Sequence, residues 1–179
     1  IFVMKIPNTN IDLELKQGDI AAQNDMEAVV NAANAQLTTG GGVAGAIHRA
    51  AGPELSEACQ PMAPIRPGEA VISGAFNLPN DYVIHCLGPI YGHDKPEDQL
   101  LANCYENALH LADKNNISSI AFPAISSGAF GYPIDSAAEV ALGTISDVAK
   151  ELKHVKLIRM VLFSNRDLEI FENKLKQLI

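Results

Sequence analysis

Short apolar segments rich in β-branched residues alternate with longer segments of helical periodicity along this chain. This alternation restricts the possible folds more than any other feature, because strands that alternate with helices pair mainly in parallel and need helices on both faces of their sheet. The expected strands are residues 11–16, 27–30, 69–75, 82–88, 118–125 and 155–163. The expected helices are residues 43–51, 97–114, 134–148 and 167–178, with Gly52 placed to cap the first and Pro53 placed to begin another. We therefore predict an α/β fold with a largely parallel sheet.

Length and composition favour a single globular domain. The 179 residues are 47% apolar and 19% charged, and a chain of this length can bury a sizeable core. We interpret residues 1–179 as one domain, in which Met4 is a natural start and residues 1–3 derive from cloning or from a longer parent. No apolar run reaches the length of a membrane span, and the first ten residues lack the features of a secretory signal.

The cysteines and the net charge limit the kinds of site, compartment and partner that we expect for this protein. Cys59, Cys86 and Cys104 are an odd number without CxxC spacing, so we expect no disulfide, no metal and a reducing, cytoplasmic environment. The net charge of −8, from 13 basic and 21 acidic residues, argues against nucleic acid or an anionic membrane as a partner. A small anion is not excluded, because backbone N–H groups at a helix start bind phosphate without a positive net charge.

Three loops after expected strands are unusual. They are QGDI (17–20), the glycine-rich segment NAANAQLTTGGG (31–42) and the segment PAISSGAFGYP (123–133). Glycine loses more backbone freedom on folding than any other residue, so the triple glycine indicates that something approaches the backbone there. Ligands of such folds bind at the carboxyl ends of the strands, and the last two loops lead into helices whose positive ends would face one spot. The pattern predicts a diphosphate site.

The two generic phosphate-binding motifs do not fit this segment. Gly40, Gly42 and Gly45 satisfy GxGxxG, but Gly40 comes nine positions after Asn31 at the strand end. The acidic residue that a dinucleotide fold needs about twenty positions later is absent. Gly40 and Gly45 also have Walker-A spacing, but Ala46 follows where lysine is required. A nicotinamide-dependent oxidoreductase is therefore disfavoured.

The segments GDI, VVNAAN, GGGVAGAIHRAAGP, YVIHCLGP and FPAISSGAFGYP occur in that order over nearly the whole chain. This combination closely resembles the macrodomain family, in particular its bacterial MacroD-like branch. The resemblance implies a three-layer α/β/α sandwich with a mixed sheet, a cleft for ADP-ribose and no cofactor. It also implies that the partner is ADP-ribose or a mono-ADP-ribosylated protein, and we expect a monomer.

The resemblance assigns roles to individual residues. Asp19 looks like the carboxylate that accepts from the adenine amino group, with the Ile20 N–H beside it, although an aspartate here also suits a helix cap. Asn34 is similar to the asparagine that binds the distal ribose, the sugar whose bond is cut. Phe163 matches an aromatic residue that lies against adenine, and a place in the core is the equal alternative.

Two loops match the parts of the family that hold the diphosphate. The matched residues are Gly40, Gly41, Gly42, Val43 and Ala44 in the first loop and Ser126, Ser127, Gly128, Ala129 and Phe130 in the second. By this resemblance Phe130 lies near the distal ribose, and a core or lid role fits it nearly as well.

Ala44 departs from the MacroD-like pattern. Hydrolases of that branch carry an aspartate after the valine, where it is tied to activation of the attacking water, whereas this chain reads TGGGVAG, as viral macrodomains do. Many viral macrodomains still remove ADP-ribose from proteins. The resemblance therefore implies a hydrolase in which Asn34 and the backbone of Gly42 position the water and a substrate phosphate oxygen acts as base. Because general-base help is worth about 10²–10⁴-fold in rate, we expect slow turnover.

Three polar residues near these motifs are interpreted as structural. Asn31 is expected to brace the turn through hydrogen bonds to nearby backbone. His48 and His85 lie on apolar surfaces and belong to no HExxH or Cys/His cluster, so we expect packed or hydrogen-bonded histidines and no metal site.

We therefore predict an ADP-ribose-binding macrodomain that acts as an ADP-ribosyl hydrolase on acidic side chains of proteins. O-acetyl-ADP-ribose deacetylation would use the same pocket. The alternative is a reader module that binds ADP-ribose without chemistry, and Ala44 is the residue that favours it.

Overall fold

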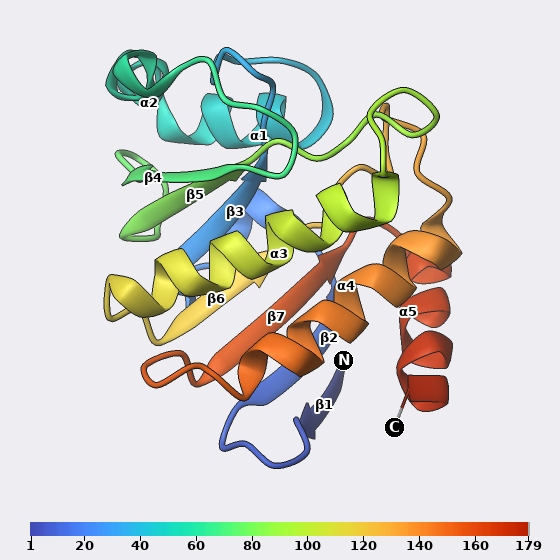
Figure 1. Ribbon diagram of the computed structural model, residues 1–179. Helices are drawn as coiled ribbons and strands as arrows, with labels where there is room; N and C mark the ends of the chain where they lie inside the picture. Colours follow the sequence, from blue (N-terminus) through green and yellow to red (C-terminus); the bar gives the residue numbers. More distant parts are fainter. Residues whose placement is uncertain (179) are drawn as a thin grey trace.

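A mixed seven-stranded sheet forms the centre of the computed structural model, which describes residues 1–178 (Figure 1). The strands are β1 (Phe2–Lys5), β2 (Asp12–Gln17), β3 (Ala28–Ala32), β4 (Ala70–Gly74), β5 (Tyr82–Cys86), β6 (Ser119–Phe122) and β7 (Leu157–Leu162). Their order across the sheet is β1-β2-β7-β6-β3-β5-β4. The inner strands run parallel, and the edge strands β1 and β4 pair antiparallel with their neighbours. The predicted α/β fold with a mixed, largely parallel sheet is confirmed.

Helices cover both faces of the sheet. They are α1 (Gly42–Ala51), α2 (Glu54–Cys59), α3 (Glu97–Lys114), α4 (Ile134–Ala149) and α5 (Asn165–Leu178), with short 3₁₀ helices η1 (Ile20–Ala22) and η2 (Gln60–Met62). Figure 1 shows α3 and α4 across the front of the sheet, with α1 and α2 at the top behind it. Every predicted helix is present, and α2 begins after Pro53 as expected.

Strand β1 is an element that the sequence pattern did not predict. We expected no element before residue 11, but Phe2 pairs with Leu15 and Met4 with Leu13. Phe2 and Met4 both pack against the core. A four-residue strand is too short to show a period of its own, and its position depends on a partner strand. Local periodicity therefore could not reveal it.

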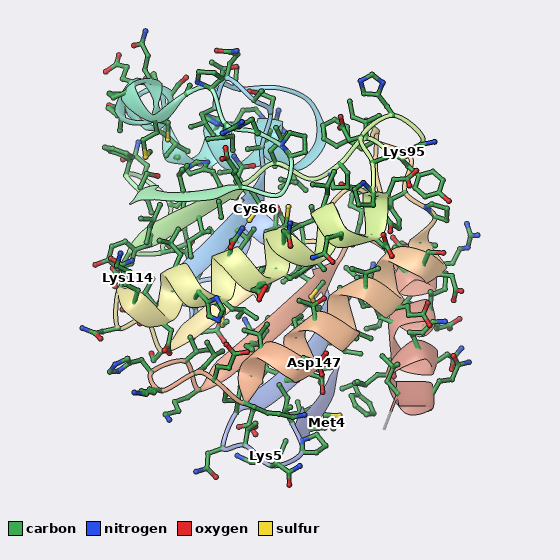
Figure 2. All side chains as sticks on the ribbon, in the orientation of Figure 1. Met4, Lys5, Cys86, Lys95, Lys114 and Asp147 are labelled. Carbon is green, nitrogen blue, oxygen red and sulfur yellow. The ribbon has the colours of Figure 1, made fainter. Side chains whose placement is uncertain are left out.

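Side chains of β3, β5, β6 and β7 alternate between two apolar clusters, one on each face of the sheet. In β7, Ile158 and Met160 belong to the cluster beneath α3, α4 and α5, whereas Val161 belongs to the cluster beneath α1 and α2. The cysteines are buried free thiols. Cys86 lies between the sheet and α3 (Figure 2), with its Sγ 3.6 Å from the carbonyl oxygen of Cys104.

Tyr105 connects α3 to the loop that follows β6. Its buried hydroxyl donates to the Pro123 carbonyl at 3.3 Å and accepts from the Ile125 N–H at 3.2 Å. Its ring packs against Phe122 with the ring centroids 5.1 Å apart. Burial raises the pKa of this phenol far above its usual value of about 10, so the hydroxyl keeps its proton. The start of the loop at residues 123–133 is thereby fixed to the helical layer.

Tyr105→Phe removes this hydroxyl and leaves the Ile125 N–H buried without its partner. Such a loss costs about 1–3 kcal/mol, so we expect the free energy of unfolding to fall by about that amount while the fold is retained. Urea denaturation followed by circular dichroism measures the change. Tyr91→Phe is the control, because the Tyr91 side chain is half-exposed; an equal loss in both variants would contradict the role of the buried hydroxyl.

Candidate functional site

The loops that follow the parallel strands meet at one edge of the sheet (Figure 1). Hydrogen bonds join neighbouring loops there. The Gly18 N–H donates to the Leu162 carbonyl at 3.0 Å, and the Tyr91 N–H donates to the Phe130 carbonyl at 2.9 Å. The short helix η1 also contacts α1. The residues predicted to bind ADP-ribose are therefore gathered along this carboxyl edge of the sheet.

The first glycine-rich loop is closed by the Asn34 side chain. Its Nδ2 donates to the Thr38 carbonyl at 2.8 Å, and its Oδ1 accepts from the Thr38 N–H at 3.1 Å. The amide carries a second N–H that is available for a ligand. Gly40 lies against this amide, and a Cβ at Gly45 would lie 2.5 Å from the Gly40 carbonyl oxygen. Close backbone approach within the loop therefore explains part of its glycine content.

Gly41 and Gly42 begin helix α1. Gly41 occupies the cap position without a side-chain cap, and Gly42 has φ of 56°, a left-handed conformation that favours glycine. Both glycines are exposed. Val43 is half-buried on the cluster beneath α1, and Ala44 is buried. The start of α1 is thus exposed at the sheet edge and has no side-chain cap for its first N–H groups, which lack partners within the helix.

The second loop contains a strained serine. Ser126 has φ of 67°, is buried, and its Oγ has no hydrogen-bond partner among the described residues. A Cβ on Gly88 would collide with that Oγ, so glycine is required there. Ser127 is half-buried and its Oγ donates to the Ala124 carbonyl at 2.7 Å. Backbone strain and an unsatisfied buried hydroxyl cluster at functional sites.

In the rest of the second loop, several residues that precede α4 are exposed to solvent. Gly128 and Ala129 are exposed, and Gly131 closes the turn by donating its N–H to the Gly128 carbonyl at 3.0 Å. Phe130 is half-buried and packs against the cluster beneath α1. The structure therefore gives Phe130 a core contact, and its contact with the ribose stays a prediction.

Asp19 caps the short helix η1. Its Oδ1 accepts from the Ala21 N–H at 2.9 Å, which confirms the cap role. The side chain is exposed, and a carboxylate has a second oxygen that can accept from an amino group. Ile20 is buried in the cluster beneath α1 and fixes this turn to the core. The cap leaves room for the predicted adenine contact.

Phe163 follows β7 directly and is 91% exposed. The alternative of a core residue is therefore wrong. Strands β2 and β7 are neighbours, so Phe163 and Asp19 lie on the same part of the edge. An exposed large aromatic side chain beside a carboxylate suits a flat, amino-bearing ligand group such as adenine.

Arg159 is connected to Asp19 through the Gln23 side chain, and the sequence pattern did not predict this role. It is buried, its Nε donates to Glu14 Oε2 at 2.7 Å, and its two Nη atoms bind both oxygens of Asp25 at 2.8 and 2.7 Å. Its Nη1 also donates to Gln23 Oε1 at 2.9 Å, and Gln23 Nε2 donates to the Asp19 carbonyl at 2.8 Å. The available signal was a basic residue inside the otherwise apolar strand LIRMVL.

Asn31 and His85 form a buried pair between β3 and β5. Asn31 Nδ2 lies 3.1 Å from His85 Nδ1, and its Oδ1 has no partner among the described residues. Asn31 is therefore structural, as expected, but the expected hydrogen bond to nearby backbone is wrong. On the other side of the ring, Nε2 lies 2.9 Å from Ser73 Oγ and 3.4 Å from Cys59 Sγ. Burial, with the nearby His48, lowers the pKa of His85 to about 3, so the ring is neutral at physiological pH. Both histidines are buried, as expected.

Two surface hollows, of about 470 and 380 Å³, are also present. The larger lies between β4 and α3, the smaller lies beside residues 36–38, and neither is lined by a predicted site residue. Within residues 1–178 no group of three or more His, Cys, Asp or Glu side chains can hold a metal ion. No helix in that part of the chain is long and apolar enough to cross a membrane. The carboxyl edge remains the candidate site.

Comparison with known proteins identifies relatives along the whole chain. Residues 30–141 match the Macro domain family. The O-acetyl-ADP-ribose deacetylase of Cronobacter turicensis is 44% identical over 171 residues, covering 92% of this chain and 96% of that protein. The ADP-ribose glycohydrolase MACROD2 of Mus musculus is 44% identical over 168 residues, covering 92% of this chain and 35% of that protein. A solved structure of an Oceanobacillus iheyensis macrodomain variant with ADP-ribose has a TM-score of 0.93 and 45% identity, covering 99% of this chain and 97% of that one.

The ion pair behind Asp19 predicts an acid-dependent loss of stability. The hydrogen bonds from Arg159 lower the pKa of Asp25 to about 2, so its contribution is fully present above about pH 4 and disappears as the pH falls toward about 2. The Asp25 side chain is 65% exposed, so the effect is screened to about 1 kcal/mol. Asp25→Asn should flatten this part of the profile of unfolding free energy against pH. Parallel profiles for the two proteins below pH 4 would contradict it.

Proposed function

The chain belongs to the Macro domain family, and from this membership we propose that it binds ADP-ribose and hydrolyses mono-ADP-ribose from acidic side chains of proteins. The observation that carries the proposal is the meeting of two loop-to-helix turns, those leading into α1 and α4. They follow the neighbouring strands β3 and β6, so their uncovered N–H groups and positive helix ends share one edge. A diphosphate is the group that such a pair of turns suits.

The sheet order arranges the ligand from end to end. Adenine lies at β2 and β7, between Asp19 and Phe163. The diphosphate lies over the starts of α1 and α4, where backbone N–H groups bind it despite the net charge of −8. The distal ribose lies at Asn34, beyond the end of β3, where the second Nδ2 hydrogen can donate to a ribose hydroxyl.

The names of two relatives support hydrolysis at the distal ribose. One is named an O-acetyl-ADP-ribose deacetylase and the other an ADP-ribose glycohydrolase, and each covers over nine-tenths of this chain. We propose both reactions for one pocket in this chain, because in each case water hydrolyses an ester of the distal ribose, the acetyl ester in one and the ester of a side-chain carboxylate in the other.

The proposed reaction on a modified carboxylate needs one water and one proton acceptor. The water oxygen forms a bond to the anomeric carbon of the distal ribose, and the bond from that carbon to the side-chain carboxylate breaks, so the carboxylate leaves with the electron pair. Asn34 holds the ribose, and the Gly42 backbone helps to place the water. Ala44 supplies no carboxylate, so a diphosphate oxygen of the substrate accepts the water proton.

The competing function is a reader that binds ADP-ribose without cleaving it. Ala44 favours this alternative, because a buried methyl group cannot take a proton. The reader and the enzyme share the same pocket, so binding data alone do not separate the two functions. A measurement of turnover separates them.

We also propose that residues 1–178 act as one domain in a reducing compartment such as the cytoplasm. Both apolar clusters pack against the same sheet, which supports one folding unit. The buried free thiols are consistent with a reducing environment.

Asp19→Ala should weaken ADP-ribose binding about tenfold, because a hydrogen bond to a charged group is worth about 1.5–3 kcal/mol and each 1.4 kcal/mol is a factor of ten. Wild type should bind ADP-ribose far better than AMP, which lacks the diphosphate. Isothermal titration calorimetry measures both.

Asp19→Ser is the matched control, because serine keeps a cap acceptor for the Ala21 N–H and loses the carboxylate. If the carboxylate binds adenine, both variants lose affinity. If Asp19→Ser binds ADP-ribose as tightly as wild type does, Asp19 serves only as a helix cap and does not bind adenine. Equal affinities for ADP-ribose and AMP would remove the diphosphate site.

Asn34→Ala should lower the rate of ADP-ribose release more than it lowers ADP-ribose affinity, because Asn34 places the reacting sugar.

Ala44→Asp should speed release by up to about 10²-fold if its carboxylate reaches the water, although a negative charge near the diphosphate should weaken binding. Single-turnover assays on a mono-ADP-ribosylated protein, with free ADP-ribose as the product measured, separate rate from affinity. Tight binding with release at the uncatalysed background in wild type would leave the reader function in place of the enzyme.

A further inference from the structure

Two exposed apolar residues on the carboxyl edge have no part in the ligand placement described above. Ile90 is 41% exposed and Tyr91 is 46% exposed, and both belong to the loop between β5 and α3. Figure 2 labels Lys95 in the same loop, at the outer rim of the molecule. Phe163, another large apolar side chain exposed on this edge, lies at the adenine end.

The sheet order places this loop next to whatever is attached to the distal ribose. Adenine lies at β2 and β7, the diphosphate at β6 and β3, and the distal ribose at the end of β3. The next strand in the same direction is β5, one strand spacing of about 4.8 Å further. A group bonded to the distal ribose therefore leaves the pocket toward the loop that follows β5, and away from Phe163.

Hydrogen bonds hold the loop in one shape. The Ile90 N–H donates to Asp94 Oδ2 at 2.8 Å, and the Gly92 N–H donates to Glu97 Oε2 at 2.9 Å. The Tyr91 N–H donates to the Phe130 carbonyl at 2.9 Å, which fixes this loop to the second diphosphate loop. The loop is thus ordered before a partner binds.

The Tyr91 ring is also held in place. It packs edge-on against Tyr132, with ring centroids 4.9 Å apart and an interplanar angle of 62°. Tyr132 is buried, so one side of the Tyr91 ring has a fixed support while the other side is open to solvent. A pre-ordered aromatic ring loses little conformational entropy on contact with a peptide, which makes it an effective anchor.

We propose that Ile90 and Tyr91 bind the polypeptide that carries the ADP-ribosylated side chain. This inference rests on the proposed function, because it needs ADP-ribose in the pocket. The covalent link between the ribose and the modified residue brings that residue's flanking backbone and apolar neighbours onto this pair. O-acetyl-ADP-ribose carries only an acetyl group at the ribose and does not reach it. The loop between β5 and α3 thereby favours modified proteins over the small ester.

The test compares two substrates in one double variant, Ile90→Ser with Tyr91→Ser. We expect kcat/KM on a mono-ADP-ribosylated protein to fall about tenfold, the loss typical of removing an interface anchor. Deacetylation of O-acetyl-ADP-ribose and the affinity for free ADP-ribose should stay unchanged. Tyr91→Phe, which keeps the ring, should retain activity on the protein substrate.

Phe76→Ser is the matched control. Phe76 is 46% exposed, the same as Tyr91. It lies in the loop between β4 and β5, just after Gly74, which pairs with Tyr82 at the start of β5. Phe76 is therefore at the edge of the sheet opposite to the carboxyl edge. This variant should leave both reactions unchanged. Equal losses on the protein and on the small ester in the double variant would overturn the proposal, as would no loss on either.

If the proposed function itself is wrong, wild type fails to bind ADP-ribose, which is a different result from those described above for the double variant. If wild type binds ADP-ribose without turnover, the same variants are compared by their affinities for the modified protein and for free ADP-ribose. A tenfold loss confined to the modified protein supports the proposal, and an equal affinity of variant and wild type for the modified protein overturns it.

Discussion

Parallel pairing of the inner strands is the constraint on which the rest of the structure depends. Each connection between parallel strands must cross back over the sheet, so the strands all end at one edge and the next helices begin there. The starts of α1, α4 and α5 lie along this edge, together with the loop before α3. Reversal of one inner strand would carry its loop to the far edge and remove its N–H groups from the site.

The proposed anion site at this edge depends more on backbone geometry than on side-chain charge. Gly42 and Ser126 both have positive φ angles, and Ser126 in addition buries a hydroxyl without a partner. Conformations of this kind cost free energy and persist only where the surroundings hold them. Here Gly88 leaves space for Ser126, and the Tyr105 hydroxyl fixes the start of the same loop. The proposed diphosphate site therefore relies on backbone N–H groups in a chain whose net charge is −8.

The two ends of the site are supported in different ways. Behind Asp19, the buried Arg159 pairs with two carboxylates and reaches the Asp19 backbone through Gln23. At the other end, the support is uncharged: a neutral His85 on β5 contacts Asn31 of β3, and Tyr91 of the loop that follows β5 packs against Tyr132. In the proposed binding mode, the end supported by Arg159 contacts adenine, which is constant, and the uncharged end faces the attached group, which varies.

By itself the sequence determined most of the element types, their approximate bounds and the loops of the candidate site. Residues 97–114, for example, coincide with α3, because helical periodicity and glycine-rich turns are properties of neighbouring residues. Only the tertiary structure decided the exposure of Phe163, the pairing of Asn31 with His85, the presence of β1 and the role of Arg159. Each of these depends on which strands become neighbours. Arg159 lies 145 positions from Glu14 in the chain and directly beside it in the sheet, and no local pattern encodes that pairing.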